Sequence, residues 1–431
     1  MHPFMGIEQW DKIGMSVAES ANRLHRLAYI DRRLARIEAG HLIARPEYEL
    51  KGALARMVWQ DASFNEQCRN RCRQLRLSTA AFDKCPDIAL ERLTNQVLDS
   101  VSTLTLLIAL FEVVKPAQLE AIDDYLQRAQ PIVDEPTITM LRHQQLDRQM
   151  QIDWGQSAAT ELLQSASEEE RQDAEKWKSL LENLLQQAGG ISGTEPRTEH
   201  EPVLPELAFS FELPNVSIRD SRFKTNRRKF DGMTFEDNDA GRFEAMMLHR
   251  FYEMTATEAL AYIFFSAESK PWAFHYDVAR HLWDEARHSW FGEAALRAKG
   301  RNVYDIPNWI GFYEMCVNEF DSIDEAYTHL TIAIEKAAMK YPPGKREEWE
   351  FCRDKVQDPL MTTFQDFDWA DEVVHAGFGQ KWIIHDVHQG DQDQAQLAAA
   401  VTQEKRTRFM ERAMGQATSD KQVTDRFAGG Y

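Results

Sequence analysis

Apolar residues recur at intervals of three and four along most of the chain, which is the spacing of one face of an α-helix. Runs that alternate between apolar and polar residues, as strands do, are nearly absent, and turn-forming residues such as Pro342-Pro343-Gly344 separate the helical windows. This pattern predicts an all-α protein. The clearest helical windows are residues 14–38, 89–114, 137–164, 243–266, 273–298, 322–340 and 358–386.

The two halves of the chain share a thin internal repeat at a constant offset. Leu24 recurs as Leu248, an offset of 224 in residue number (248 − 24), and the same offset links short matches on four separate helical windows. We therefore expect two copies of one four-helix unit, joined by a linker. The matches are Leu24-His25-Arg26 with Leu248-His249-Arg250, Trp59 with Trp283, Ile108-Ala109-Leu110 with Ile332-Ala333-Ile334, and Gly155-Gln156 with Gly379-Gln380.

The repeat and the shifts in composition predict four parts along the chain. We expect a first bundle over residues 1–165, and then a charged helix and a Gly/Pro-rich linker over residues 166–235. A second bundle is expected over residues 236–388, followed by a peripheral charged helix and tail over residues 389–431. The basic segment 217–229 falls in the linker and is expected to be solvated.

Charge and cysteine usage narrow the location and the partners. A net charge of −19 argues against general affinity for nucleic acid or anionic membranes, because both are polyanions. The N-terminus shows no basic region followed by an apolar run, and no apolar stretch is long enough to span a bilayer. Five scattered cysteines indicate reduced thiols rather than a disulfide framework. We therefore expect a cytoplasmic protein.

Two Glu-x-x-His motifs lie on different helical windows of the second half, Glu285-Ala-Arg-His288 and Glu372-Val-Val-His375. Residues three apart share a helix face, so each motif directs a carboxylate and an imidazole toward the same point. One such motif arises easily by chance in a glutamate-rich helix. Two of them, completed by a glutamate on each of two further helices, form the ligand set of a dinuclear iron or manganese site in a bundle.

Glutamates on the two remaining helices can complete the set. Glu335 lies in an apolar segment, where an unpaired carboxylate would be costly to bury. On the first helix, Glu253 and Glu258 are both candidates. The interval from Glu253 to Glu285 is 32 in residue number, and the interval from Glu335 to Glu372 is 37. Both intervals suit two helices joined by a short or moderate loop, so we prefer Glu253 and keep Glu258 as a nearby acid.

Further polar residues flank the two motifs. Asp284 and Asp371 each directly precede a motif glutamate. A metal-bound histidine usually donates its other ring N–H to a carboxylate, so we expect a crossed arrangement in which Asp284 supports His375 and Asp371 supports His288. His281, one turn before the first motif, is a candidate proton relay.

The ligand types indicate the metal. Four carboxylates and two imidazoles without a thiolate suit iron or manganese, although zinc would also bind such a set. Two divalent ions would neutralise the four carboxylates. We expect two iron ions, with manganese as the alternative, held by Glu253, Glu285, His288, Glu335, Glu372 and His375.

These residues resemble the ferritin-like superfamily, which includes rubrerythrin, bacterioferritin and related di-iron oxygenases. The resemblance covers residues 243–386 well and residues 20–160 faintly, and it looks closest to a bacterial branch of the superfamily. It implies an antiparallel bundle with oxygen or peroxide chemistry. Ferritin-like bundles commonly pair side by side, so it also implies tandem ferritin-like four-helix bundles that form an intrachain pseudo-dimer. The motifs that carry it are His249-Arg-Phe-Tyr-Glu253, Asp284-Glu-Ala-Arg-His288 and Asp371-Glu-Val-Val-His375-Ala-Gly-Phe-Gly.

The first copy lacks the ligand set. Only Asp61 is a comparable carboxylate, and Arg148 stands where a glutamate is expected. We therefore predict a degenerate bundle without metal, in which Arg148 pairs with Asp61, because a buried arginine needs such a partner. The residues found by subtracting 224 from the six proposed ligands are Tyr29, Asp61, Phe64, Phe111, Arg148 and Gln151.

The leading interpretation is an O2-activating non-haem di-iron oxidoreductase that acts on a small molecule, with O2 as co-substrate. The alternatives are a ferroxidase or iron-handling protein, a peroxide-scavenging protein of the manganese catalase type, and a non-catalytic assembly module. Iron storage fits poorly with a fused chain that carries a degenerate copy. The expected partners are the substrate, an electron-donor protein and, in a homodimer, a second copy of the chain.

Overall fold

The computed structural model describes residues 2–198 and 210–414. Regular structure in these ranges is almost entirely helical, which confirms the all-α prediction. The only strands there are β1 (Thr225–Asn226) and β2 (Asn308–Trp309), which pair in parallel. Residues 199–209 of the predicted linker and residues 415–431 of the predicted tail lie outside the described residues. No helix in the described ranges has both the length and the apolar character needed to cross a bilayer.

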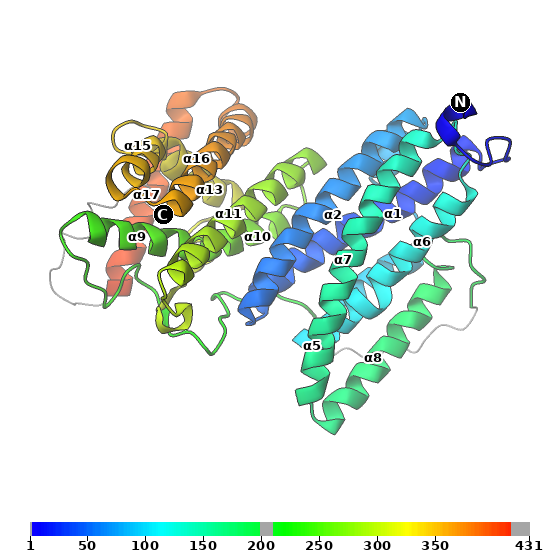
Figure 1. The fold of residues 1–431 in the computed structure, drawn as a ribbon, viewed down its shortest axis with the longest axis horizontal. Coiled ribbons are helices and arrows are strands. Elements are labelled where there is room, and N and C mark those ends of the chain that lie inside the picture. Colours follow the sequence, from blue (N-terminus) through cyan, green and yellow to red (C-terminus); the bar gives the residue numbers. More distant parts are fainter. Residues whose placement is uncertain (1, 199–209, 415–431) are drawn as a thin grey trace. The chain divides into compact units, whose positions relative to one another are not determined.

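The chain forms two compact units (Figure 1). The first unit comprises Met1–Ile37 and Gln60–Glu212, and the second comprises Glu38–Trp59 and Leu213–Tyr431. The division therefore runs through the two long helices α1 (Val17–Ala44) and α2 (Tyr48–Gln74). The end of α1 and the start of α2 form a helical hairpin that belongs to the second unit.

The first unit is built on α1, α2 and a run of shorter helices. Ser102 and Ser167 start two of these helices with capping boxes, in which the serine side chain accepts from the backbone three residues later. The remaining elements of this unit are η1 (Pro3–Gly6), α3 (Thr79–Phe82), α4 (Ile88–Leu98), α5 (Thr103–Ile108), the π-helical η2 (Ala109–Val114), α6 (Lys115–Arg128), α7 (Glu135–Ser165) and α8 (Glu168–Gln187).

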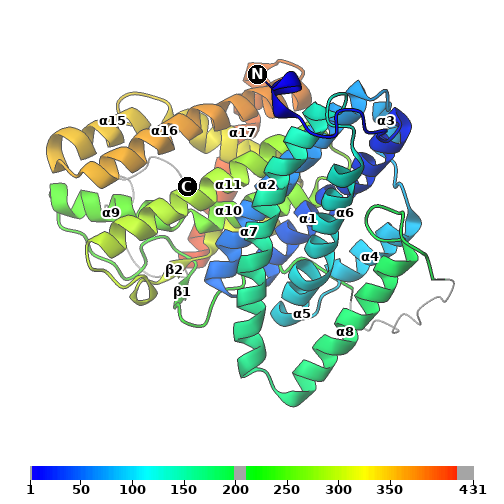
Figure 2. The same cartoon turned by 45° about the vertical axis from the view of Figure 1, so that its right-hand side comes forward.

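Figure 2 labels the main helices of the second unit. A break separates its first two helices, α9 and α10, and, within the described residues, three π-helical segments interrupt the regular α-helices further along. Asp358 caps one of the long helices, and Pro359 occupies the first turn, where a missing N–H costs nothing. The helices are α9 (Asp239–Phe251), α10 (Met254–Ser266), α11 (Trp272–Ala298), η3 (Val303–Asp305), α12 (Gly311–Asn318), α13 (Ile323–Thr328), the π-helical η4 (His329–Glu335), α14 (Lys336–Ala338), α15 (Lys345–Glu350), the π-helical η5 (Phe351–Val356), α16 (Pro359–Gly379), the π-helical η6 (Gln380–Val387) and α17 (Gln392–Met414).

Four helical segments of the second unit pack around a shared interior. The consecutive α9 and α10 both contact α11, α11 contacts α16, α16 contacts η4, and α13, which leads into η4, contacts α10. The helix bounds also follow the offset of 224 seen in the sequence. The bounds of α2 (48–74) and of α11 (272–298) differ by this number at both ends, as do the first residues of α7 (135) and α16 (359).

Glycines at one pair of offset-related positions bring helices close together in both units. A Cβ atom on Gly155 of α7 would lie 2.0 Å from the ring of Phe111 in η2. A Cβ atom on Gly379 of α16 would lie 2.8 Å from the side chain of Thr331 in η4. Any larger residue would push α7 away from η2, or α16 away from η4, so close helix packing explains why both positions are glycine.

A neutral network of two acids and two cations occupies the interior of the first unit. Arg148 Nη1 donates to Asp61 Oδ1 at 2.8 Å, which confirms the predicted pair, and Nη2 donates to Asp31 Oδ1 at 2.9 Å. Lys115 Nζ donates to Asp61 Oδ2 at 3.0 Å and to Gln151 Oε1 at 2.9 Å. The four charged side chains are almost fully buried, so their charges must cancel locally.

We predict that Asp61→Ala lowers the free energy of unfolding of the first unit by about 3–5 kcal/mol, because it leaves Arg148 and Lys115 buried with a single counter-charge. Urea unfolding followed by circular dichroism measures the change. Asp153→Ala is the matched control, because Asp153 is exposed on α7 and accepts one hydrogen bond, from Gln149. Equal losses in the two variants would contradict a stabilising role for the network.

Candidate metal centre

The structure brings the six predicted ligands into the interior of the second unit. Each of the six is at most 1% exposed. They come from all four packed segments: one from the junction of α9 and α10, two from α11, one from η4 and two from α16. In the same order they are Glu253, Glu285, His288, Glu335, Glu372 and His375.

Two of these glutamates lie where the helical geometry is irregular. Glu253 follows the end of α9 at Phe251 and precedes the start of α10 at Met254, so it sits in the break of a helix. Glu335 is the last residue of the π-helical η4. Single π-helical turns are rare in proteins as a whole, but those that occur are often found at functional sites. The wider turn changes the direction of the residues that follow it.

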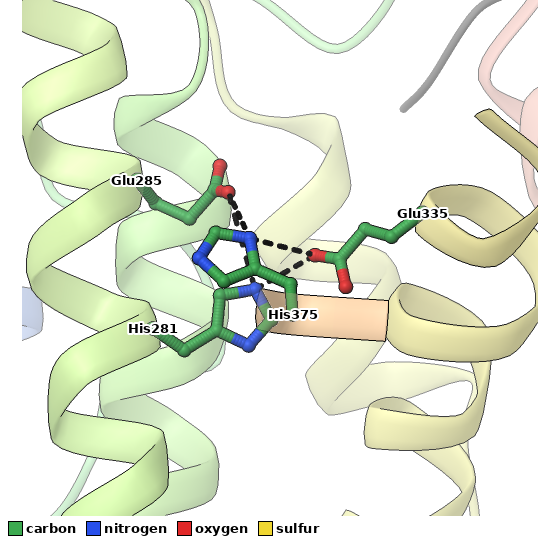
Figure 3. A group of neighbouring side chains, drawn as sticks. All are labelled: His281, Glu285, Glu335 and His375. Carbon is green, nitrogen blue, oxygen red and sulfur yellow. Dashed lines mark hydrogen bonds and ion pairs between the residues drawn. The ribbon is translucent and has the colours of Figure 1, made fainter. Parts of the chain in front are cut away.

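Nitrogen and oxygen atoms of these residues form three overlapping clusters, in each of which all atoms lie within 4.8 Å of one another. Figure 3 shows the first cluster, with the side chains of α11, η4 and α16 pointing toward one another. Such buried groups could hold a metal ion. The clusters are His281, Glu285, Glu335 and His375; then Glu253, Glu285 and His288; and then His288, Asp368 and Glu372.

Several atoms in the clusters are buried without a hydrogen-bond partner among the described residues. They are Glu253 Oε2, His288 Nδ1, Glu335 Oε2, Glu372 Oε2 and His375 Nδ1. Leaving one such atom without a partner costs about 1–3 kcal/mol. A bound cation would satisfy all five of these oxygen and nitrogen atoms together.

The Nδ1 atoms of both histidines lie near carboxylate oxygens of the glutamates, but beyond hydrogen-bond distance of them. His288 Nδ1 lies 3.8 Å from Glu253 Oε2, and His375 Nδ1 lies 3.8 Å from Glu335 Oε1. Both Nδ1 atoms lie 3.6 Å from Glu285 Oε1. All four distances exceed those of direct hydrogen bonds, so these atoms lie close together without satisfying one another.

The opposite ring nitrogens of both histidines contact aspartates in the crossed arrangement expected from the sequence. His375 Nε2 lies 3.3 Å from Asp284 Oδ2, and His288 Nε2 lies 3.2 Å from Asp371 Oδ2. A carboxylate on Nε2 fixes the proton there and leaves Nδ1 as the lone-pair donor. The Nδ1 atoms are the ones directed at the glutamates, so both rings are oriented for a cation.

Two arginines hold these aspartates. Arg280 Nε donates to both oxygens of Asp284 at 2.8 and 2.7 Å, and Arg287 Nη2 donates to Asp371 Oδ2 at 2.8 Å. Burial alone would raise the pKa of Asp284, but His375, Arg287 and Arg280 lower it below its ordinary value. The aspartate therefore stays ionised and keeps accepting from the histidine.

His281 bonds to a proposed ligand rather than standing apart from the cluster. Its Nε2 lies 2.7 Å from Glu335 Oε1 and its Nδ1 lies 3.3 Å from the hydroxyl of Tyr327. Burial and then His375, whose ring stacks on it with centroids 3.8 Å apart, lower the pKa of His281. A neutral His281 therefore donates from Nε2 to Glu335 and accepts at Nδ1 from Tyr327.

Glu258, predicted as a nearby acid of the centre, lies in a different network. Its carboxylate is 2.9 Å from Lys51 Nζ and also accepts from Arg219 and Ser217. It belongs to none of the three clusters, because the helix break at Glu253 and the turn of α10 that follows direct it elsewhere. Within the basic segment 217–229, which was expected to be solvated, Arg219 is an exception at 2% exposure, whereas Arg222 and Arg227 are 45% and 61% exposed.

Three further charged residues, missed from the sequence, join the centre. Arg250 Nη1 donates to Glu253 Oε1 at 2.6 Å and to Asp368 Oδ1 at 2.7 Å. Lys345 Nζ lies 2.8 Å from Glu372 Oε1 and 3.1 Å from Asp368 Oδ2. Asp368 could have been found, because it precedes Glu372 by one helical turn. Lys345 follows an irregular loop and gives no sequence signal.

These residues change the expected charge balance. The prediction was four carboxylates neutralised by two divalent ions, whereas the structure contains five carboxylates and two buried cations. Burial, opposed by Arg250, raises the pKa of Glu253 to about 8, and burial followed by Glu372 and Glu285 raises that of Glu335. The acids therefore repel one another and still carry an excess of three negative charges when all are ionised.

Comparisons of the chain with protein-family models, with curated proteins and with solved structures find no match. The inference about this centre therefore rests on its own residues and geometry.

We predict that Asp284→Ala or Asp371→Ala lowers metal affinity about 10–100-fold, as removal of a carboxylate behind a ligating histidine typically does. Elemental analysis after dialysis against iron or manganese buffers of stated free concentration measures this change. Asp366→Ala, an exposed position on α16, is the control. Full metal retention in both aspartate variants would show that the crossed contacts do not support metal ligands.

Proposed function

We propose that the second unit holds a dinuclear metal centre of the ferritin-like type and that the protein is an O2-activating oxidoreductase acting on a small molecule. The observation that carries this proposal is the convergence of lone-pair atoms from four helical segments on one buried volume. Their burial, their spacing and the histidines fixed by aspartates all support a bound cation.

The clusters suggest how two ions would be shared. Glu253 and His288 would hold one ion, and Glu335 and His375 the other. Glu285 takes part in the clusters of both histidines. The remaining ligand, Glu372, groups with His288 and also has its Oε2 atom 3.9 Å from His375 Nδ1. Both motif glutamates, Glu285 and Glu372, would therefore help to hold the metal beside the two histidines.

The donor set favours iron or manganese. It consists of carboxylate oxygens and imidazole nitrogens, and none of the three clusters contains a cysteine. Iron bound there would supply electrons for the reduction of O2, and an electron-donor protein would restore them.

The side chains of the chain itself would set the conditions for this chemistry. Burial of every ligand excludes bulk water, which strengthens the electrostatic interactions inside the site. Arg250 and Lys345 hold carboxylates in place by charge. His281 links Glu335 to Tyr327 by hydrogen bonds and would hold a proton at Nε2, next to the centre.

We predict about two metal ions per chain after loading with Fe2+, and metal-dependent O2 consumption that continues when an electron donor is supplied. Elemental analysis and an oxygen electrode measure the two quantities. His288→Ala and His375→Ala should each lose at least half of the metal and the O2 consumption, because each removes a nitrogen ligand. His385→Ala, an exposed histidine of η6, should change neither.

Other outcomes would select a different function. Many iron atoms per chain would indicate iron handling, and release of O2 from hydrogen peroxide would indicate peroxide scavenging. Four ions per chain would contradict the loss of the site from the first unit. Absence of bound metal in the wild-type chain would contradict the proposal and leave a non-catalytic assembly module.

A further inference from the structure

Basic side chains from three elements gather beside the proposed metal centre but outside its ligand set. Lys229 precedes α9, His249 lies on α9 one turn before Glu253, and Arg406 lies on α17. Burial, followed by the charge of Arg406, lowers the pKa of Lys229. The same charge also lowers the pKa of His249, after burial, Lys229 and other cations. The groups are therefore close enough to repel one another.

Arg406 is a cation of this group that has no acidic partner among the described residues. Its side chain is half-buried, burial lowers its pKa, and it forms no hydrogen bond or ion pair with any described residue. By contrast, Arg250 and Lys345 each contact carboxylates directly. A half-buried guanidinium among other cations is unfavourable unless an anion binds to it.

The position of Arg406 is fixed by the packing of α17 against η4 and α13. Thr402 lies one turn before Arg406 on the same face, and its Oγ1 lies 2.9 Å from His329 Nδ1 at the start of η4. The hydroxyl of Thr402 donates to Ala399 O at 2.7 Å, so it accepts from Nδ1–H of His329. The next turn of α17, which carries Arg406, therefore continues from the start of η4 along α13, where the neighbouring Lys405 contacts Glu325.

His329 supplies a second, independent polar group at this place. It is fully buried, and its Nε2 has no hydrogen-bond partner among the described residues. Burial and then Arg406 lower the pKa of His329 to about 3, so the ring is neutral. With the proton on Nδ1, Nε2 can accept a hydrogen bond from an O–H or N–H of a ligand.

Aromatic rings lie between the basic groups. Lys229 Nζ lies 5.5 Å from the ring centre of Trp309, and the rings of Trp309 and Phe312 are 6.1 Å apart. Phe312 is in turn 6.1 Å from His329. A ligand held here would therefore meet positive charge together with flat apolar surfaces.

We propose that Arg406, Lys229 and His329 form a binding site for a small organic acid, with the two cations on its carboxylate and His329 Nε2 accepting from a hydroxyl or amino group. The proposal rests on the proposed function in taking this acid as the substrate of the metal centre. His249 lies four positions before Glu253 and His329 six before Glu335. His329 and Glu335 are the first and last residues of the seven-residue η4, so a ligand at His329 lies at one end of this short segment and the proposed metal ligand at the other.

The charge balance of the metal centre permits the same ligand class. Its five carboxylates and two cations would carry one positive charge after two divalent ions bind, and Lys229 and Arg406 add to it. Glu348, 3.4 Å from Arg250, offsets one of these charges. With Glu348 counted the loaded centre is neutral, so it does not repel a carboxylate, and the attraction comes from Lys229 and Arg406.

The first test needs no knowledge of the substrate. If the role of Arg406 is to bind an anionic ligand, its charge destabilises the ligand-free chain. Arg406→Met should then raise the thermal unfolding midpoint of the ligand-free full chain by about 2–4 °C, because it removes an uncompensated charge. Arg408→Met is the matched control, since Arg408 is exposed on the same helix and contacts the backbone of Glu404. A lower midpoint in Arg406→Met would mean that the arginine has a structural counter-charge, and it would overturn the proposal.

The second test uses 4-hydroxybenzoate as a probe and 4-hydroxybenzamide as its uncharged analogue, titrated anaerobically by calorimetry into wild-type protein loaded with Mn2+. We expect the acid to bind at least 10-fold more tightly than the amide, and Arg406→Met and Lys229→Met each to weaken it at least 10-fold. Arg408→Met should bind it as the wild type does. No binding of the acid, or equal binding of acid and amide, would overturn the proposal. Metal content is measured separately, so loss of the metal centre and loss of the acid site are distinguished.

Discussion

The organisation of the second unit depends on one constraint, which is that several carboxylates are buried in the same interior and repel one another. Burial of an ionised carboxylate is unfavourable unless a cation or several hydrogen bonds compensate it. The acids Glu253, Glu335 and Glu372 each keep one oxygen without a hydrogen-bond partner among the described residues. Arg250 and Lys345 compensate part of the charge. With Glu348, which contacts Arg250, an excess of four negative charges remains, which two divalent ions would balance.

The first unit solves the same problem with the protein's own cations. Asp61 stands at the position that the offset of 224 matches to Glu285, and it is bound by Arg148 and Lys115. Two acids and two cations satisfy one another there, and every cluster of metal-binding type found among the described residues lies in the second unit. The two interiors therefore differ in the positive charges that their acids meet, although the long helices α2 and α11 have bounds that differ by the constant offset of 224.

The sequence predicted the parts of this arrangement that depend on local helical spacing. The all-α class follows from the three- and four-residue periodicity, and the contacts of Asp284 with His375 and of Asp371 with His288 follow from two motifs with the same preceding residue. The sequence did not reveal Lys345, which is brought in by tertiary packing after an irregular loop, or the grouping of the hairpin 38–59 with the second unit. The sequence also did not reveal that Glu258 pairs with Lys51 and Arg219, which are distant along the chain, rather than with the centre.

The most direct test of the metal centre is anomalous scattering at the iron and manganese absorption edges, from crystals of the full chain soaked anaerobically with Fe2+ or Mn2+. Two peaks about 3.5–4 Å apart, lying between Glu285 and Glu372 and within bonding distance of the Nδ1 atoms of His288 and His375, are expected. A map without peaks at these histidines, or with peaks beside Asp61 in the first unit instead, would contradict the account.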